Sequence, residues 1–113
     1  MAEIERAREL LRLDRPQLFA LLAQGSPEYT AAAQADFSPR EFGERIFETM
    51  RDKLNEVVCP HYCSSREHWL SKDSAELVVV VAGWLDESLV GYPILTISVI
   101  LVKSGLHVLC DCK

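Results

Sequence analysis

The charged residues of this chain lie mostly in its first two thirds, and its last third is almost uncharged. Residues 1–76 contain fourteen acidic and ten basic side chains, whereas residues 77–113 contain three acidic and two basic ones. Removing apolar surface from water is the main driving force of folding. The last third is therefore expected to be covered, either by the charged part of the chain or by a partner.

Length and overall composition indicate one globular domain over residues 1–113. This length is typical of a single domain. Apolar residues make up 49% of the chain and charged residues 26%, which excludes a disordered or low-complexity protein. The net charge of −5 argues against nucleic acid as a partner, because binding of the phosphate backbone requires a surplus of basic residues.

The compartment expected from the sequence is the cytoplasm. The first nine residues are rich in charge, and no apolar segment typical of a signal peptide follows them. The longest apolar stretch, residues 77–102, is interrupted by Asp86 and Glu87 and by Gly91 to Pro93, so neither piece reaches the roughly 20 residues of a membrane-spanning helix. Four cysteines are too few for a secreted disulfide scaffold. We therefore expect a reducing environment and no membrane.

Residues 1–72 are predicted to be mainly helical. Asp14 is expected to cap a short helix, with the Gln17 side chain reaching back to the cap. The arginines of the N-terminal segment, Arg15 among them, alternate with acidic residues, which is typical of a solvated helix face.

A longer helix is predicted to begin at Pro39. Ser38 suits the N-cap position and proline the first helical position, and Phe37 against Phe42 would form a hydrophobic staple. The helix is expected to end before Cys59-Pro60, because the residue preceding a proline is disfavoured in the helical conformation.

Residues 76–112 are predicted to form antiparallel strands. The segments 77–85 and 94–103 are rich in β-branched residues. As a strand, 77–85 would be apolar on both faces, and 94–103 would have one face more apolar than the other. Ser104-Gly105 has the length of a two-residue hairpin loop. The expected fold class is α+β, a two-layer domain in which N-terminal helices pack on a three-stranded antiparallel meander.

The outer face of this expected sheet is the candidate interaction surface. This face combines apolar and polar residues, and a loop with an aromatic side chain precedes it. A short sheet also has two unpaired edges. A protein partner would bury both the apolar residues of the face and these edges. We expect a small cytoplasmic protein-interaction or regulatory domain that self-associates as a homo-oligomer or docks to a protein partner. The predicted interaction residues are Tyr92, Ile94, Ile100, Val102, His107 and Leu109.

The four cysteines form the one cluster with metal-ligand character. Cys59 and Cys63 with Cys110 and Cys112 could supply four sulfur ligands to a structural zinc ion. A C-x-C pair on a strand separates its sulfurs widely, however, so buried free thiols are the favoured interpretation, and a redox or disulfide role is a further alternative. The corresponding alternative function is a zinc-stabilised binding module, and no other cofactor is expected.

A small thiol-dependent enzyme is the remaining alternative. His61 and His68 flank Cys63 and Glu67, which invites a cysteine and histidine nucleophile. No oxyanion donor or family signature accompanies them, and the glycines are too dispersed for a phosphate-binding loop. No catalytic residue is predicted, and an interaction domain is the favoured class.

Overall fold

The computed structural model describes residues 2–27, 38–64, 68–69 and 72–110, and every regular element within them is a helix. The hydrophobic core takes side chains from each of the six assigned helices. These helices are α1 (Ala2–Leu11), α2 (Arg15–Gly25), α4 (Pro39–Ser64), α6 (Ser74–Leu85), α7 (Ile94–Ser104) and α8 (Leu106–Leu109).

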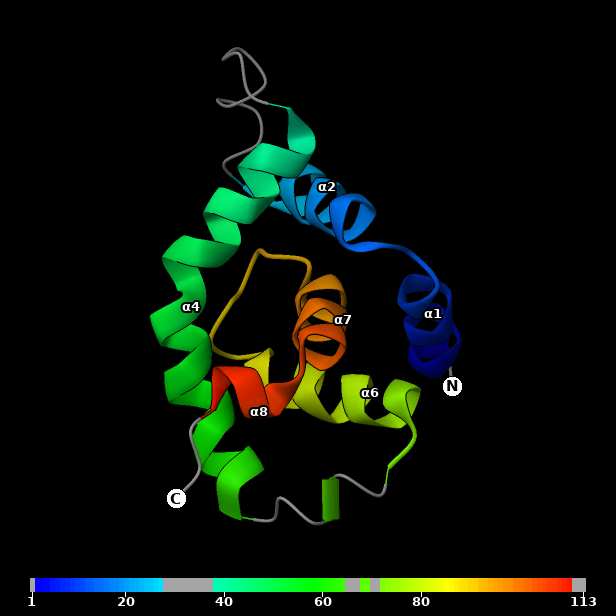
Figure 1. Ribbon diagram of the computed structural model, residues 1–113, viewed down its shortest axis with the longest axis vertical. Coiled ribbons are helices and arrows are strands. Elements are labelled where there is room, and N and C mark those ends of the chain that lie inside the picture. Colours follow the sequence, from blue (N-terminus) through cyan, green and yellow to red (C-terminus); the bar gives the residue numbers. More distant parts are fainter. Residues whose placement is uncertain (1, 28–37, 65–67, 70–71, 111–113) are drawn as a thin grey trace.

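Helix α7 lies in the middle of the fold (Figure 1), where it contacts α1, α2, α6 and α8. The long helix α4 runs along one side, crosses α2 at one end of the molecule and reaches α8 at the other. All six consecutive residues from Thr96 to Leu101 are buried. The central segment of the apolar C-terminal third is therefore covered by the chain's own helices.

The predicted α+β fold with a three-stranded meander is wrong, because the segments assigned to strands form α6, α7 and α8. Helix α7 is surrounded by other helices and has apolar residues on all its faces, so it lacks the 3.6-residue periodicity that marks an amphipathic helix. Apolar residues at alternating positions of such a segment therefore do not distinguish a strand from a helix. Segment length favours helices instead, since α6 has 12 residues and α7 has 11, whereas most strands are shorter.

Gly105 ends a helix, and the predicted hairpin loop is also wrong. Its φ of 95° is readily adopted only by glycine, and its N–H lies 3.0 Å from the carbonyl oxygen of Leu101 and 3.2 Å from that of Val102. The chain turns at this point from α7 into α8. A glycine directly after an apolar segment signals a helix C-terminus as well as a turn.

The local predictions for two helix starts are confirmed. The Asp14 carboxylate accepts a hydrogen bond from the Gln17 backbone N–H, and the Gln17 side chain accepts one from the Asp14 N–H, both at 3.0 Å. Helix α4 begins at Pro39, with the Ser38 hydroxyl accepting from the Glu41 N–H at 3.2 Å. The staple expected at Phe37 lies outside the described residues.

Helix α4 does not end before Cys59-Pro60, as predicted, but continues to Ser64. A proline inside a helix costs about 3 kcal/mol because it removes one hydrogen bond and crowds the preceding turn. The turns around it are stabilised by tertiary contacts. Tyr62 is buried in the core, and the Trp69 indole N–H donates to the His61 carbonyl at 3.1 Å.

The backbones of α2 and α4 touch at Gly43. A Cβ atom at this position would lie 1.8 Å from the carbonyl oxygen of Phe19. Only glycine permits this approach. The contact brings Phe19 on α2 beside Phe47 on α4, where the candidate site begins.

Candidate binding groove

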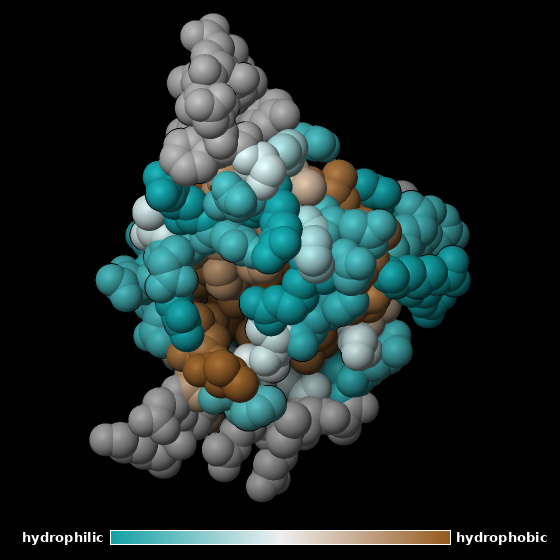
Figure 2. Space-filling view, turned by 45° about the horizontal axis from the view of Figure 1, so that its top comes forward, coloured by the Kyte–Doolittle hydropathy of each residue, from teal (hydrophilic) through white to brown (hydrophobic). Residues whose placement is uncertain are grey.

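A groove opens between α2, α4, the end of α7 and α8, with a cavity volume of about 560 Å³. Figure 2 shows hydrophobic surface set back between hydrophilic side chains on one face of the molecule. The groove is lined by Arg15, Pro16, Phe19, Arg40, Glu44, Phe47, Glu48, Arg51, Leu101, Ser104, Gly105, Val108 and Leu109.

The floor of the groove is apolar. Phe19 and Phe47 meet edge to face, with ring centroids 5.7 Å apart and an interplanar angle of 74°. Leu101 of α7 is buried beneath them, while Val108 of α8 is 62% exposed at the edge. Most large apolar side chains of the described residues are covered, so an exposed valine beside an aromatic floor marks surface that a ligand could cover.

Charged side chains border this floor. The Arg40 guanidinium lies 3.1 Å from a Glu44 carboxylate oxygen, and Arg51 lies 3.9 Å from Glu48. Three arginines therefore face two glutamates, which leaves one positive charge at the groove of a chain whose net charge is −5. A positive local charge attracts an acidic group to the groove.

The surplus charge belongs to Arg15. Its Nη1 donates a hydrogen bond to the Ser104 hydroxyl at 2.9 Å, and its Cζ lies 5.5 Å from the centroid of the Phe19 ring. Among the described residues no carboxylate pairs with it. Arg15 is thus positioned by α7 and by an aromatic ring, and its charge is available to a ligand.

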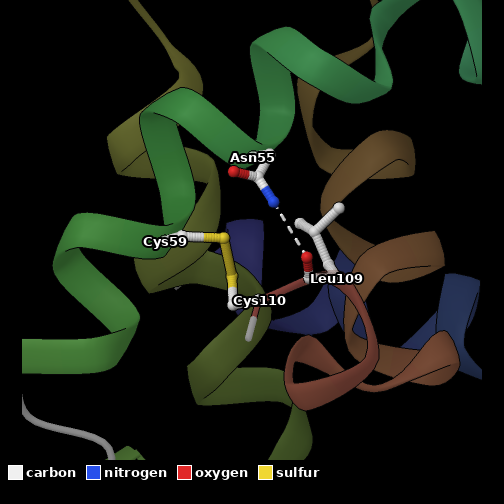
Figure 3. Close-up of a disulfide and its surroundings, with 4 residues drawn as sticks. All are labelled: Asn55, Cys59, Leu109 and Cys110. Atoms are coloured by element: carbon white, nitrogen blue, oxygen red, sulfur yellow. Dashed lines mark hydrogen bonds between the residues drawn. A yellow bond between two sulfur atoms is a disulfide. The ribbon is translucent and has the colours of Figure 1, made fainter. Parts of the chain in front are cut away.

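One wall of the groove is attached by a disulfide (Figure 3). Cys59 of α4 is bonded to Cys110, which directly follows α8, with a Cα–Cα distance of 5.3 Å. Beside it the Asn55 side-chain amide donates to the Leu109 carbonyl at 2.9 Å. These two connections attach the four-residue helix α8, and with it Val108, to α4.

Three of the four predicted zinc ligands are disulfide-bonded in this structure. Cys59 and Cys110 form a disulfide, Cys63 is also disulfide-bonded, and Cys112 lies outside the described residues. The described part of the chain has no group of three or more His, Cys, Asp or Glu side chains arranged around a common metal position. A sulfur in a disulfide is not a thiolate, so a zinc site would first require reduction.

The residues of the thiol-enzyme alternative take part in an aromatic cluster and a disulfide. The His61 ring stacks on Trp84 at 4.9 Å, and Trp69 lies edge-on to Trp84 at 5.3 Å and to His68 at 4.7 Å. The sulfur of Cys63 is oxidised. Glu67 lies outside the described residues.

The predicted interaction residues do not form a sheet face, because the described residues contain no sheet. Leu109 lines the groove, Ile94 lines a second hollow between α6 and α7, and Val102 and His107 line a third. Ile100 is buried and Tyr92 half-buried. Of the six residues, the structure places only Leu109 at the candidate site.

Sequence reasoning missed the residues that define the groove. The alternation of charges predicts a solvated helix face for Arg15 and does not predict a role in a groove. Arg15 and Ser104 are 89 positions apart, so no local pattern announces their contact. The one available signal was Gly43, an isolated glycine in a helical pattern, which indicates a close approach of two backbones.

Comparison with known proteins reveals no significant match to a family model, a curated protein or a solved structure. In the described ranges, the helices are too short or too polar to cross a membrane. Fold and site together define a small α-helical, disulfide-linked protein with an arginine-bordered apolar groove.

Proposed function

We propose that this protein is a small interaction domain whose groove docks a segment of another protein. The segment would place apolar side chains against Phe47 and Val108 and acidic side chains at the arginines. The observation that carries the proposal is the combination of an apolar floor, in which Phe47 is half-buried against the buried ring of Phe19, with an arginine that lacks a carboxylate partner among the described residues. Aromatic residues and arginine are the types most enriched at the energetic centres of protein interfaces.

A second copy of the chain is the alternative occupant of the groove, and an experiment must distinguish it from a segment of another protein. The loop after α6 exposes Asp86 and Glu87 together with Val90, which is 80% exposed, so it has the required chemistry. Light scattering at micromolar concentration distinguishes the cases. A monomer supports docking of another protein, whereas a concentration-dependent oligomer that depends on Val90 supports self-association.

The disulfide bears on where the domain works. Disulfides persist in oxidising compartments and are rare in a reducing cytoplasm. The Cys59–Cys110 bond therefore favours an oxidising compartment over the cytoplasmic location expected from the sequence. Alkylation of intact cells that produce the protein distinguishes the two compartments. Cysteines that stay unmodified support an oxidising compartment, and alkylated cysteines support the cytoplasm.

The groove itself is tested by selecting random peptides displayed on phage against the oxidised protein. The variant Val108→Asp places a carboxylate at the apolar edge, and we expect it to lose the selected peptides. The matched control is Val90→Asp, which alters the other strongly exposed valine, away from the groove. Peptides that bind both variants as well as the wild type would refute the groove as the docking site.

A further inference from the structure

Arg15 differs from the other two arginines of the groove in its electrostatic environment. Arg40 and Arg51 each have a glutamate within 4 Å on their own helix, whereas Arg15 contacts the neutral hydroxyl of Ser104 and the face of Phe19. A ligand carboxylate at Arg40 or Arg51 would have to compete with these glutamates. At Arg15 it would meet no competing carboxylate among the described residues.

The guanidinium of Arg15 is already oriented. Arginine loses considerable side-chain entropy when it is ordered for binding. Here the hydrogen bond to Ser104 and the contact with Phe19 provide part of that order before a ligand arrives. A guanidinium has five N–H donors, so most remain for a ligand after one is used for Ser104.

We infer that Arg15 recognises a side-chain carboxylate of the docked segment, next to a large apolar side chain that rests on the half-buried Phe47. The inference rests on the proposed function and specifies the chemistry of its partner. A planar carboxylate matches the guanidinium fork in a two-bond geometry. The apolar neighbour is expected because Arg15 and Phe47 both lie beside the Phe19 ring. The Arg15 Cζ is 5.5 Å from its centroid, and the Phe47 centroid is 5.7 Å from it.

A carboxylate suits this position better than a phosphate group. Recognition of phosphate uses clusters of cations, and here one unneutralised cation stands beside Glu44 and Glu48. A dianion would be repelled by these two carboxylates and by the net charge of −5, whereas a single negative charge would be repelled less.

The test uses two blocked tetrapeptides, Leu-Phe-Glu-Leu and Leu-Phe-Gln-Leu, titrated into the ¹⁵N-labelled oxidised protein while amide chemical shifts are recorded. The peptides differ only in the carboxylate. We expect the glutamate peptide to shift groove amides with an affinity about two- to fivefold higher, the size of effect typical for a solvent-accessible charge pair.

Variants assign this difference to Arg15. Arg15→Gln should abolish the preference, and Arg15→Lys should keep part of it, because lysine retains the charge and loses the fork. Ser104→Ala should reduce it by freeing the guanidinium. The matched control is Arg12→Gln, since Arg12 is exposed and lines a hollow on α1 away from the groove.

The outcomes separate failure of the docking function from failure of the role of Arg15. If neither peptide shifts groove amides, both the docking function and the role of Arg15 are refuted. If both peptides bind equally, or if Arg15→Gln keeps the preference, the groove remains a docking site and the role of Arg15 is refuted. If inorganic phosphate shifts the same amides as strongly as the glutamate peptide, the site is a general anion site and carboxylate recognition is wrong.

Discussion

The Lys103 ammonium group donates a hydrogen bond to the carbonyl oxygen of Leu11 at 3.0 Å, across 92 positions of sequence. Leu11 is the last residue of α1, and Lys103 also donates to the Leu13 carbonyl just beyond it. The last carbonyls of a helix lack partners within the helix, and a positive charge stabilises that end. One side chain thus connects the end of α1 to the central helix α7.

Replacing this ammonium should loosen α1. We expect Lys103→Met to lower the free energy of unfolding by about 1 kcal/mol, a modest value because water can solvate the released carbonyls. Urea denaturation measures the loss, and hydrogen exchange should show faster exchange in α1 than in α4. Lys53→Met changes an exposed lysine of α4 and should leave both unchanged. Unaltered exchange in α1 of Lys103→Met would contradict the assignment.

Two glycines in helices should respond oppositely to alanine. Gly83→Ala should raise the free energy of unfolding by about 0.5–1 kcal/mol, because a Cβ there meets nothing within 4 Å and alanine favours the helix. Gly43→Ala should lower it by about 2–3 kcal/mol, because the new Cβ clashes with the Phe19 carbonyl and forces α2 from α4. Thermal unfolding compares the two. Equal effects would show that the helices do not touch at Gly43.

Removing the disulfide should affect both stability and the groove. The double variant Cys59→Ser with Cys110→Ser opens a link across 51 positions, so we expect a loss of about 3–4 kcal/mol in the free energy of unfolding. Peptide affinity should also fall, because α8 and Val108 then depend on the Asn55 hydrogen bond for attachment to α4. Calorimetry and peptide titration measure the two effects. Asn55→Ala is the milder comparison, with an expected loss of about 1 kcal/mol.

The redox state should decide whether the cysteines bind zinc. Oxidised protein is expected to contain less than about 0.1 equivalent of zinc, since structural zinc needs thiolate ligands and binds at near one equivalent. Metal analysis of protein purified without reductant and without added zinc checks this. A full equivalent in that protein would instead support the zinc-stabilised module.

The contrast between Asp14 and Pro60 shows which helix boundaries can be predicted. A cap depends on atoms a few residues apart, so the Asp14–Gln17 pairing was visible in the sequence. The predicted stop at Cys59-Pro60 followed an equally local rule and was wrong. There the burial of Tyr62 and the Cys59–Cys110 bond, which are tertiary, outweigh the local cost of a proline.

The sequence by itself determined the helix caps, and it showed that the nearly uncharged last third had to be covered. Only the tertiary structure decided that this third is helical, because a segment surrounded by apolar neighbours is apolar on every face whether it is a strand or a helix. The groove also depends on the tertiary structure. Arg15 acquires its role from Ser104 and Phe19, and it meets Ser104 only after α2 and α7 have packed together.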